Sequence, residues 1–241
     1  MNILFLNKLR VREIEDVLEK HGDLFRGKRV LEIGGGTGVQ AEFLSEIAQE
    51  VVSLEIAESN YRDSANHHIV MYDGRHIPFP DSSFDIVYSS NVLEHIAHRD
   101  DFQKELMRVL KPEGHAIHSM PTQWWKLRDI LENMLLFLPT FAWHLHKKIR
   151  GVNVPSSSVL PYVLGDRHGE FGNTLTEVYY FMPRTWLVHF RRQEWKVLED
   201  YGGGLFYTGR LIFGQKLSWP ARRLLARFFG SSVHVYHLQK V

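Results

Sequence analysis

Three glycines at alternate positions follow a short aliphatic run near the start of the chain. The run occupies residues 30–33, and Gly34, Gly36 and Gly38 come directly after it. Glycine has no Cβ and adopts positive φ without steric cost, so the backbone can turn sharply here and present its N–H groups. A strand that turns through glycines into a helix lets a nucleotide-like ligand lie against those N–H groups. The sequence therefore predicts an α/β fold with a ligand at the carboxyl edge of its sheet.

The spacing of these glycines leaves three interpretations open. A dinucleotide-binding turn has glycines at positions i and i+2 and Gly or Ala at i+5. Gly36, Gly38 and Ala41 satisfy that pattern, but they start late relative to the strand. The pattern Glu-x-Gly-x-Gly-x-Gly fits from Glu32 onward, directly at the end of the strand. A glycine-rich loop with no ligand is the third interpretation.

Length and composition narrow the class of protein. A chain of 241 residues is expected to form one domain, 1–241, with an added segment. The net charge of +1 gives no global argument for nucleic-acid binding. The absence of cysteine excludes disulfides, thiolate metal sites and a cysteine nucleophile, and it is consistent with a reducing cytoplasm. No apolar stretch is long enough to predict a signal peptide or a transmembrane helix.

Strand and helix patterns alternate between residues 29 and 120, which predicts a parallel, doubly wound sheet. Apolar residues at helical spacing precede the first strand and recur in 41–47 and 102–110. The Lys-Pro-Glu-Gly turn at 111–114 ends the last of these helices, because proline cannot continue a helix. A mostly parallel, seven-stranded α/β sheet is expected. The predicted strands are Arg29–Ile33, Val51–Ile56, His68–Tyr72, Phe84–Ser89, His115–Met120, Trp195–Asp200 and Ser232–Gln239.

The alternation stops after Pro121. Residues 123–150 are aromatic and helix-like, and residues 151–174 are rich in glycine, serine and proline. We therefore expect residues 121–192 to form a helical and loop insertion, or lid, between the fifth and sixth strands. Residues 217–230 carry three arginines among leucines and phenylalanines and no acid, which predicts a basic amphipathic helix.

Further motifs follow the glycine turn in chain order. Glu55 and Asp73 end the second and third predicted strands, where a carboxylate accepts hydrogen bonds from ribose hydroxyls or from an amino group. The stretch Ile-Pro-Phe-Pro-Asp-Ser-Ser-Phe-Asp at 77–85 leads into the fourth strand. Asn-Val-Leu-Glu-His at 91–95 follows that strand, and Leu-Lys-Pro-Glu-Gly at 110–114 precedes the fifth.

Together these motifs resemble the type 11 branch of the class I S-adenosylmethionine-dependent methyltransferases. The resemblance covers residues 29–120, and its motifs lie in register with the predicted sheet. It implies a Rossmann-like methyltransferase fold with S-adenosyl-L-methionine as the cofactor. A nicotinamide-dependent dehydrogenase shares the glycine turn and an acid at the position of Glu55. It lacks the Pro-Phe-Pro-Asp segment before the fourth strand and the Leu-Lys-Pro-x-Gly turn before the fifth.

The resemblance also implies a set of cofactor contacts. Glu55 would hold the ribose, Ile56 would pack on the adenine, and Glu32 would reach the methionine amino group. Asp73 would lie at the adenine edge, although an Asp-Gly pair is also a plain turn signal. The expected cofactor-binding residues are Glu32, Gly34, Gly36, Gly38, Glu55, Ile56, Asp73, Gly74, Ser90 and Asn91.

Methyl transfer to a hydroxyl benefits from a general base, and histidine suits that role near neutral pH. Among the 14 histidines, His168 lies in a polar loop of the insertion and is the favoured candidate. His118 lies at the carboxyl end of the fifth strand, and His95 is expected with Glu94 at the start of a helix after the fourth strand; both histidines are further candidates. No group of histidines and acids shows metal-ligand spacing in the sequence, so no metal is predicted.

Two aromatic and basic segments bear on the acceptor. Residues 124–150 and 219–229 combine tryptophan, phenylalanine and leucine with lysine or arginine. One interpretation makes them lid helices packed on the sheet or on a partner subunit of a homo-oligomer. The other places them at a membrane interface, where basic amphipathic helices bind, and predicts a hydrophobic or lipid-linked acceptor.

The sequence thus predicts an S-adenosylmethionine-dependent methyltransferase that acts on an oxygen of a small-molecule, glycan or lipid-linked acceptor. A nicotinamide-dependent oxidoreductase and a non-catalytic scaffold subunit with the same fold are the alternatives. Nucleic acid is not an expected partner, because no basic stripe accompanies the active edge. The expected location is the cytoplasm, and peripheral contact with the inner membrane face is left open.

Overall fold

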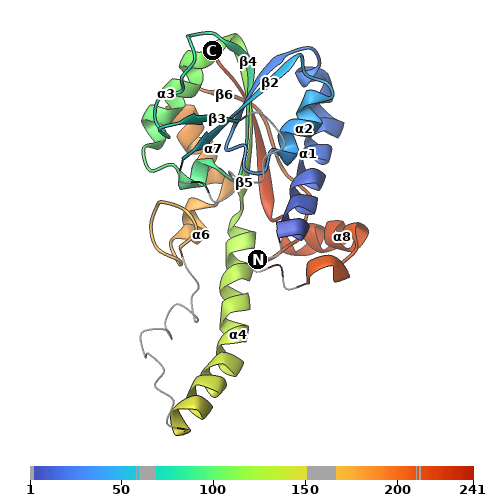
Figure 1. Cartoon of the computed structure of the whole chain (residues 1–241), viewed down its shortest axis with the longest axis vertical. Helices are drawn as coiled ribbons and strands as arrows, with labels where there is room; N and C mark the ends of the chain where they lie inside the picture. Colours follow the sequence, from blue (N-terminus) through green and yellow to red (C-terminus); the bar gives the residue numbers. More distant parts are fainter. Residues whose placement is uncertain (1–2, 58, 60–68, 151–166, 210, 212) are drawn as a thin grey trace.

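The computed structural model describes residues 3–57, 59, 69–150, 167–209, 211 and 213–241. Its strands are β1 (Arg29–Ile33), β2 (Glu50–Ile56), β3 (Ile69–Tyr72), β4 (Phe84–Ser90), β5 (Leu110–Pro121), β6 (Lys196–Gly202) and β7 (Val233–Gln239). They form one seven-stranded sheet in the order β3-β2-β1-β4-β5-β7-β6 (Figure 1). The first five strands run parallel, and β7 is antiparallel to both β5 and β6.

The mostly parallel, doubly wound sheet predicted from the sequence is confirmed. The strand boundaries agree to within two residues except at β5, which begins at Leu110 rather than at His115. Leu110 already pairs with Phe84, and the register then shifts before His115 pairs with Ile86. The intervening turn passes through Glu113 at a φ of 58°, so the Lys-Pro-Glu-Gly segment is a bulge within the strand. His68, the predicted first residue of β3, lies outside the described residues.

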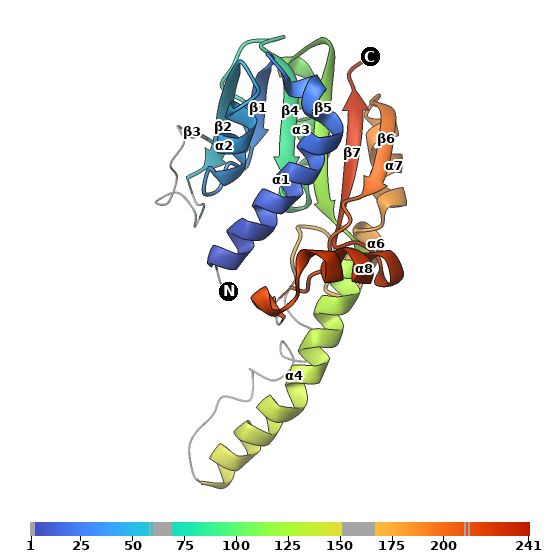
Figure 2. The same cartoon turned by 90° about the vertical axis from the view of Figure 1, so that its right-hand side faces the viewer.

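Helices cover both faces of the sheet, as a doubly wound fold requires (Figures 1 and 2). Helices α1 (Ile3–Phe25) and α2 (Val39–Ser45) lie on one face, where Ile14, Val17 and Leu44 enter the core. Helices α3 (Arg99–Val109) and α7 (Pro183–Arg192) lie on the other face. The predicted helices at 41–47 and 102–110 correspond to α2 and α3.

The segment predicted as an insertion, 121–192, divides into parts with different surroundings. Helix α4 (Gln123–Ile149) extends away from the sheet in both views, and the short helix α6 (Glu177–Tyr180) lies beside its first turns (Figures 1 and 2). Helix α7 instead packs on the sheet, because Trp186 and Phe190 are fully buried in the main core. Residues 151–166 of the predicted loop lie outside the described residues.

Apolar side chains remain exposed along α4. Leu131, Leu135 and Ile149 are exposed by 55%, 64% and 77%. Helix α8 (Trp219–Phe229), which corresponds to the predicted amphipathic helix 217–230, exposes Phe228 by 72%. Among the described residues, none of the helices combines the length and apolarity that crossing a bilayer requires.

The arginines of α8 do not form a uniform basic face. The Arg222 side chain is buried and donates hydrogen bonds to the backbone carbonyl oxygens of Phe206 and Gly214. Its guanidinium also lies over the Phe5 ring, 4.9 Å from the ring centre. Arg223 pairs with Asp16 of α1 at 2.5 Å, so two of the three arginines attach α8 to the domain.

Replacing Arg222 with alanine is expected to destabilise the fold. The carbonyl oxygens of Phe206 and Gly214 would lose a charged donor and two aromatic rings would lose their packing partner, so the free energy of unfolding should fall by about 2–4 kcal/mol. Urea denaturation measures this loss. Arg227→Ala is the matched control, since Arg227 is an exposed arginine of the same helix and the change should stay within about 0.5 kcal/mol. Equal stabilities of the two variants would contradict the proposed anchoring role.

Candidate functional site

The glycine turn joins β1 to α2 at the carboxyl edge of the sheet. Gly34, Gly36 and Gly38 have φ values of 74°, 55° and 78°, which residues other than glycine adopt only with strain. The N–H groups of Gly34 and Gly35 donate to the carbonyl oxygen of Leu54, at 2.8 and 3.0 Å. A Cβ at Gly34 would lie 2.4 Å from Cγ2 of Val92, so the turn has no space for a side chain there. These contacts explain why glycines occupy the positions the sequence singled out.

Glu55 ties the end of β2 to the same turn. Its Oε2 accepts a hydrogen bond from the Gly36 N–H at 2.9 Å, and its Oε1 accepts from its neighbour Ile56 at 3.0 Å. The side chain is buried from bulk solvent yet lines a cavity at this edge. Each oxygen retains further acceptor capacity, because a carboxylate oxygen has two lone pairs. Glu55 is therefore held in a fixed position and can still accept donors from a ligand.

Glu32 lies beneath the turn rather than in the cavity wall. It is buried, and it accepts a hydrogen bond from the Ser53 hydroxyl at 2.5 Å. Burial raises the pKa of Glu32 to about 8, and the nearby charge of Glu55 acts in the same direction. A Cβ at Gly35 would lie 3.3 Å from the Glu32 carboxylate, so the turn rests almost directly on it. The carboxyl group is poised to ionise when a cation comes close.

Asp73 and Gly74 form a tight turn after β3. The Asp73 Oδ1 accepts hydrogen bonds from the N–H groups of Arg75 and His76, at 2.8 and 2.7 Å. These bonds lower the pKa of Asp73 below its usual range. Gly74 has a φ of 75°, and a Cβ there would lie 3.3 Å from Ile56. Asp73 thus has the structural role that its Asp-Gly sequence indicated, and its contact with adenine stays a prediction.

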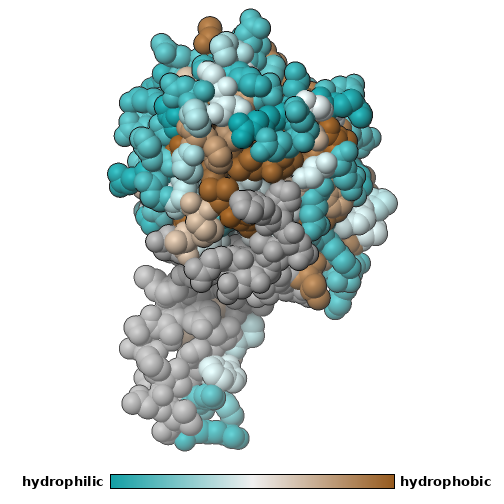
Figure 3. All heavy atoms as spheres, turned by 45° about the horizontal axis from the view of Figure 1, so that its top comes forward, coloured by the Kyte–Doolittle hydropathy of each residue, from teal (hydrophilic) through white to brown (hydrophobic). Residues whose placement is uncertain are grey.

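A cavity of about 670 Å³ opens beside the glycine turn at the carboxyl ends of β1, β2, β4 and β5. Eight of the predicted site residues line it: Gly34, Gly36, Glu55, Ile56, Ser90, Asn91, His95 and His168. Glu32, Gly38, Asp73 and Gly74 are not part of its described lining. In Figure 3, apolar surface gathers near the middle of the domain, beneath a polar rim.

Sequence reasoning missed part of the opposite wall of the cavity, although the segment 124–150 was expected to bear on the acceptor. Arg10 from α1 and Tyr207 after β6 both line it, and each contacts the buried carboxylate of Glu13, at 2.5 and 2.7 Å. Trp125 and Asp129 from the first turns of α4 complete this wall. No local motif marks these residues, because three separate segments contribute them.

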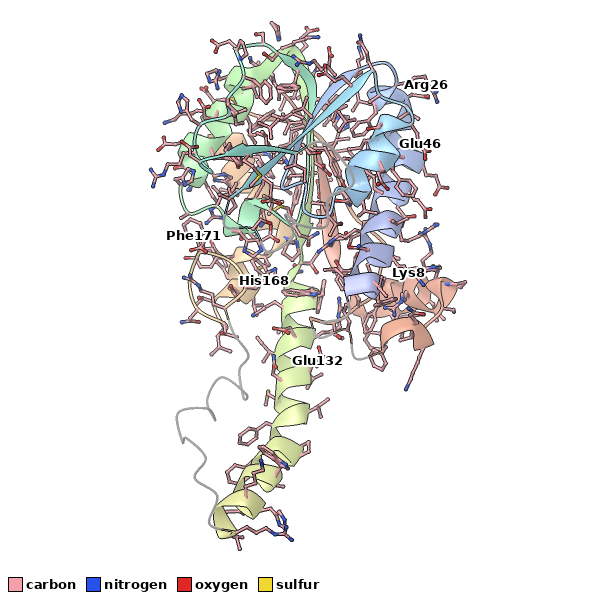
Figure 4. The ribbon with its side chains drawn as sticks, viewed as in Figure 1. Lys8, Arg26, Glu46, Glu132, His168 and Phe171 are labelled. Carbon is pink, nitrogen blue, oxygen red and sulfur yellow. The ribbon has the colours of Figure 1, made fainter. Side chains whose placement is uncertain are left out.

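Two of the three predicted base candidates meet at one end of the cavity. The rings of His95 and His168 are in edge contact, with centres 4.8 Å apart, and the Trp125 ring lies 4.6 Å from that of His168. Figure 4 places His168 where the first turn of α4 approaches the sheet. The Nε2 atoms of both histidines lie 3.8 Å from Oε1 of Glu94, which is fully buried. Burial lowers the pKa of His168 to about 3 and raises that of Glu94 to about 8, so both groups favour their neutral forms.

The third candidate, His118, lies beneath the cavity in the core. It has no exposed surface, its Nδ1 is 2.8 Å from the Ser89 hydroxyl, and its ring stacks on Phe190 of α7. Burial lowers the pKa of His118 to about 3. The strand alternation turns its side chain toward the α7 face, so His118 does not face the cavity.

Residues 31–118 match the model of a family described as "Methyltransferase domain". The match runs from β1 into β5 and includes the glycine turn, Glu55, Asp73 and the His95 segment. It ends before α4 and the loop that carries His168.

Curated relatives are similar to this chain over the same part. A ubiquinone/menaquinone biosynthesis C-methyltransferase UbiE from Vibrio cholerae is 30% identical over 139 residues, which are 51% of this chain and 50% of that protein. A probable S-adenosylmethionine-dependent methyltransferase from Mycolicibacterium smegmatis is 32% identical over 120 residues, or 46% of this chain and 45% of that protein. The chain thus spans about half the length of the curated relatives it matches.

A solved structure of a SAM-dependent methyltransferase from Aquifex aeolicus has the same fold, with a TM-score of 0.55. The superposition covers 95% of this chain and 89% of that chain, at 14% sequence identity. At this identity the likeness supports the fold alone.

The protonated state of Glu32 predicts an unusual pH dependence of stability. Its pKa is about 8 in the folded chain against 4.5 for the free group, so only the unfolded state ionises between these values. Stability should therefore fall as pH rises across this window, by up to about 1.4 kcal/mol per pH unit from this group. Glu32→Gln removes the contribution, so the variant should gain stability relative to wild type between pH 4.5 and pH 7.

Urea denaturation at pH 4.5, 5.5 and 7 measures the effect. Glu46→Gln is the control, because Glu46 is an exposed acid that follows α2 (Figure 4). Parallel pH profiles for wild type and Glu32→Gln would show that Glu32 titrates normally.

Proposed function

We propose that this chain is a class I S-adenosylmethionine-dependent methyltransferase that transfers a methyl group to a hydroxyl oxygen of its acceptor. The observation that carries the proposal is the single cavity that joins the glycine turn and Glu55 to the pair His95 and His168. One end suits the cofactor and the other carries groups that accept a proton.

The residues at the glycine end fit S-adenosyl-L-methionine. Gly34 and Gly36 line this end of the cavity without side chains, so a ligand can lie against the backbone of the turn. Glu55 would accept the ribose hydroxyls, and Ile56, which is 37% exposed at the end of β2, would pack on the adenine. Ser90 and Asn91 at the end of β4 would lie along the methionine arm. The bound cofactor supplies a methyl group already activated by a sulfonium.

Glu32 supports the same orientation of the cofactor. Its carboxyl group lies under Gly35 and holds its proton because it is buried. An ammonium group near the turn would favour the ionised form, since an opposite charge lowers the pKa of a carboxyl group. This is the interaction expected with the amino group of the methionine part.

The chain's main contribution to transfer is alignment and proton handling. In the transfer step, the acceptor oxygen forms a bond to the methyl carbon as the bond between that carbon and the sulfur breaks. The hydroxyl proton passes to a base. Alignment of reacting atoms supplies about 7–11 kcal/mol of a barrier. A neutral imidazole on His168 can accept a hydrogen bond from the hydroxyl and then take its proton.

The cavity wall and α4 support an acceptor with an apolar part. Trp125 lines the cavity, and the exposed apolar side chains of α4 continue outward from it. A small molecule, a glycan precursor or a lipid-linked hydroxyl compound agrees with this surface. Contact with a membrane face and self-association through α4 stay predictions of the same surface, as does a cytoplasmic location.

Carbon methylation is the second candidate. The observation that favours it is the similarity to the C-methyltransferase UbiE of Vibrio cholerae. The match to a methyltransferase domain removes support from the nicotinamide-dependent alternative. A non-catalytic scaffold would bind the cofactor and transfer nothing, which the second experiment below detects.

Glu55→Ala is expected to weaken binding of S-adenosyl-L-methionine. Loss of hydrogen bonds to a charged group costs about 1.5–3 kcal/mol, which corresponds to a dissociation constant raised roughly 10- to 150-fold. Calorimetric titration measures the change. Glu50→Ala is the control, since Glu50 begins the same strand at its far, exposed end. Unchanged affinity in Glu55→Ala would end the assignment of Glu55 to the cofactor.

His168→Ala is expected to slow methyl transfer by about 10²–10⁴-fold while cofactor affinity stays within twofold of wild type. The assay incubates the protein with methyl-labelled cofactor and separated aqueous and lipid fractions of a cell extract. Hydroiodic acid then releases label from a methyl ether but not from a methylated carbon skeleton. His76→Ala, which changes a histidine with an 80% exposed side chain, should leave transfer unchanged. Label retained after hydroiodic acid would favour carbon methylation, and no transfer to any fraction would favour the scaffold.

A further inference from the structure

Three metal-ligating side chains converge at one end of the cavity. Glu94 and His95 come from the short helix η2 (Leu93–His95), and His168 comes from the loop before α6. One ligand atom from each lies within 4.8 Å of the other two, and Oε1 of Glu94 is 3.8 Å from Nε2 of each histidine. This is a compact group of one carboxylate and two imidazoles.

In the described part of the chain, no other residue donates a hydrogen bond to the Glu94 carboxylate. Its side chain is fully buried. A buried polar group without a partner is costly, and such groups in native proteins call for an explanation. A bound cation would supply the missing partner.

The loop that carries His168 is fixed against η2 by its backbone. The N–H groups of His168 and Gly169 both donate to Oε1 of Glu177, at 2.7 and 2.6 Å. The N–H of Glu170 donates to the Glu94 carbonyl at 2.9 Å, and a Cβ on Gly169 would lie 2.9 Å from that carbonyl. The approach of His168 to Glu94 is thus built into the fold.

We propose that Glu94, His95 and His168 bind one divalent first-row transition-metal ion in the wall of the cavity. Two imidazole nitrogens and a carboxylate oxygen favour zinc, iron, cobalt or nickel over magnesium and calcium, which prefer all-oxygen sites. Zn²⁺ with bonds of about 2.0–2.1 Å holds its ligand atoms about 3.4 Å apart in a tetrahedron. Binding therefore requires the two histidine rings to move toward Glu94 by small rotations.

Neighbouring charges permit a cation here. The positive charge of Arg10 acts on Glu94, and that of Lys126 acts on His168. Arg10 contacts Glu13 at 2.5 Å, and Lys126 contacts Glu177 at 2.8 Å, so a carboxylate accompanies each positive charge.

The site has three protein ligands, which leaves a coordination position open toward the cavity. This consequence rests on the proposed function, with the ion in place of His168 as the group that promotes proton loss, since His168 would then be a ligand and not the base. An acceptor hydroxyl bound at the open position would lose its proton more readily, because a metal ion lowers the pKa of a bound hydroxyl. Binding of the ion itself does not depend on that role.

The test titrates the untagged, chelator-treated full chain with Zn²⁺ and counts bound ions by elemental analysis after dialysis. Wild type is expected to bind one equivalent. Glu94→Gln and His168→Ala should each weaken binding at least tenfold, and His76→Ala, which removes an exposed histidine, should bind as wild type does. Cofactor titration of each variant checks that it is folded, because the glycine turn lies outside the changed residues.

Three outcomes would overturn the proposal. They are no bound Zn²⁺ in wild type, equal Zn²⁺ binding by wild type and Glu94→Gln, or binding of Mg²⁺ in preference to Zn²⁺. The metal titration and the methyl-transfer assay separate the two proposals. Zinc binding without methyl transfer would support the metal site and contradict the proposed function. Methyl transfer without zinc binding would support the proposed function and contradict the metal site.

Discussion

The proposed cofactor end of the cavity depends on the attachment of the glycine turn to the end of β2. Parallel pairing sets Ile33 beside Leu54, and the next two N–H groups of the turn then donate to the Leu54 carbonyl. Glu55 follows in the strand and accepts from Gly36. The strand register thus fixes both the shape of the turn and the carboxylate beside it, so the turn and the acid act as one unit.

A buried ion pair fixes the other end of the cavity, where His95 and His168 lie. Lys126 of α4 and Glu177 of α6 are fully buried and 2.8 Å apart. The same carboxylate accepts the N–H groups of His168 and Gly169, so it holds the histidine loop against α4 and η2. Because breaking a buried pair leaves an uncompensated charge, this arrangement resists displacement of the loop. The histidine cluster therefore depends on contacts far from it in the chain.

Burial gives several titratable groups near the cavity unusual protonation states. Glu32 and Glu94 are carboxyl groups whose pKa values are raised to about 8, and the pKa of His168 is lowered to about 3. One physical cause, the cost of burying charge, acts on all of them. Each group would respond strongly to a nearby opposite charge. That property suits a site that, by our two proposals, receives a cationic cofactor at one end and a metal ion at the other.

The sequence by itself determined the sheet and the glycine turn that lines one end of the cavity. Strand periodicity and the glycine turn are local patterns, and the residues they mark meet because parallel strands share one carboxyl edge. Tertiary structure alone decided the rest. His168 lies far along the chain from Glu94 and His95, and it reaches them through a loop whose position depends on Lys126 and Glu177. His118 shows the converse, because its strand position was predicted correctly while side-chain alternation turned it into the core. Local pattern specifies which element a residue occupies, whereas long-range packing specifies which side chains meet.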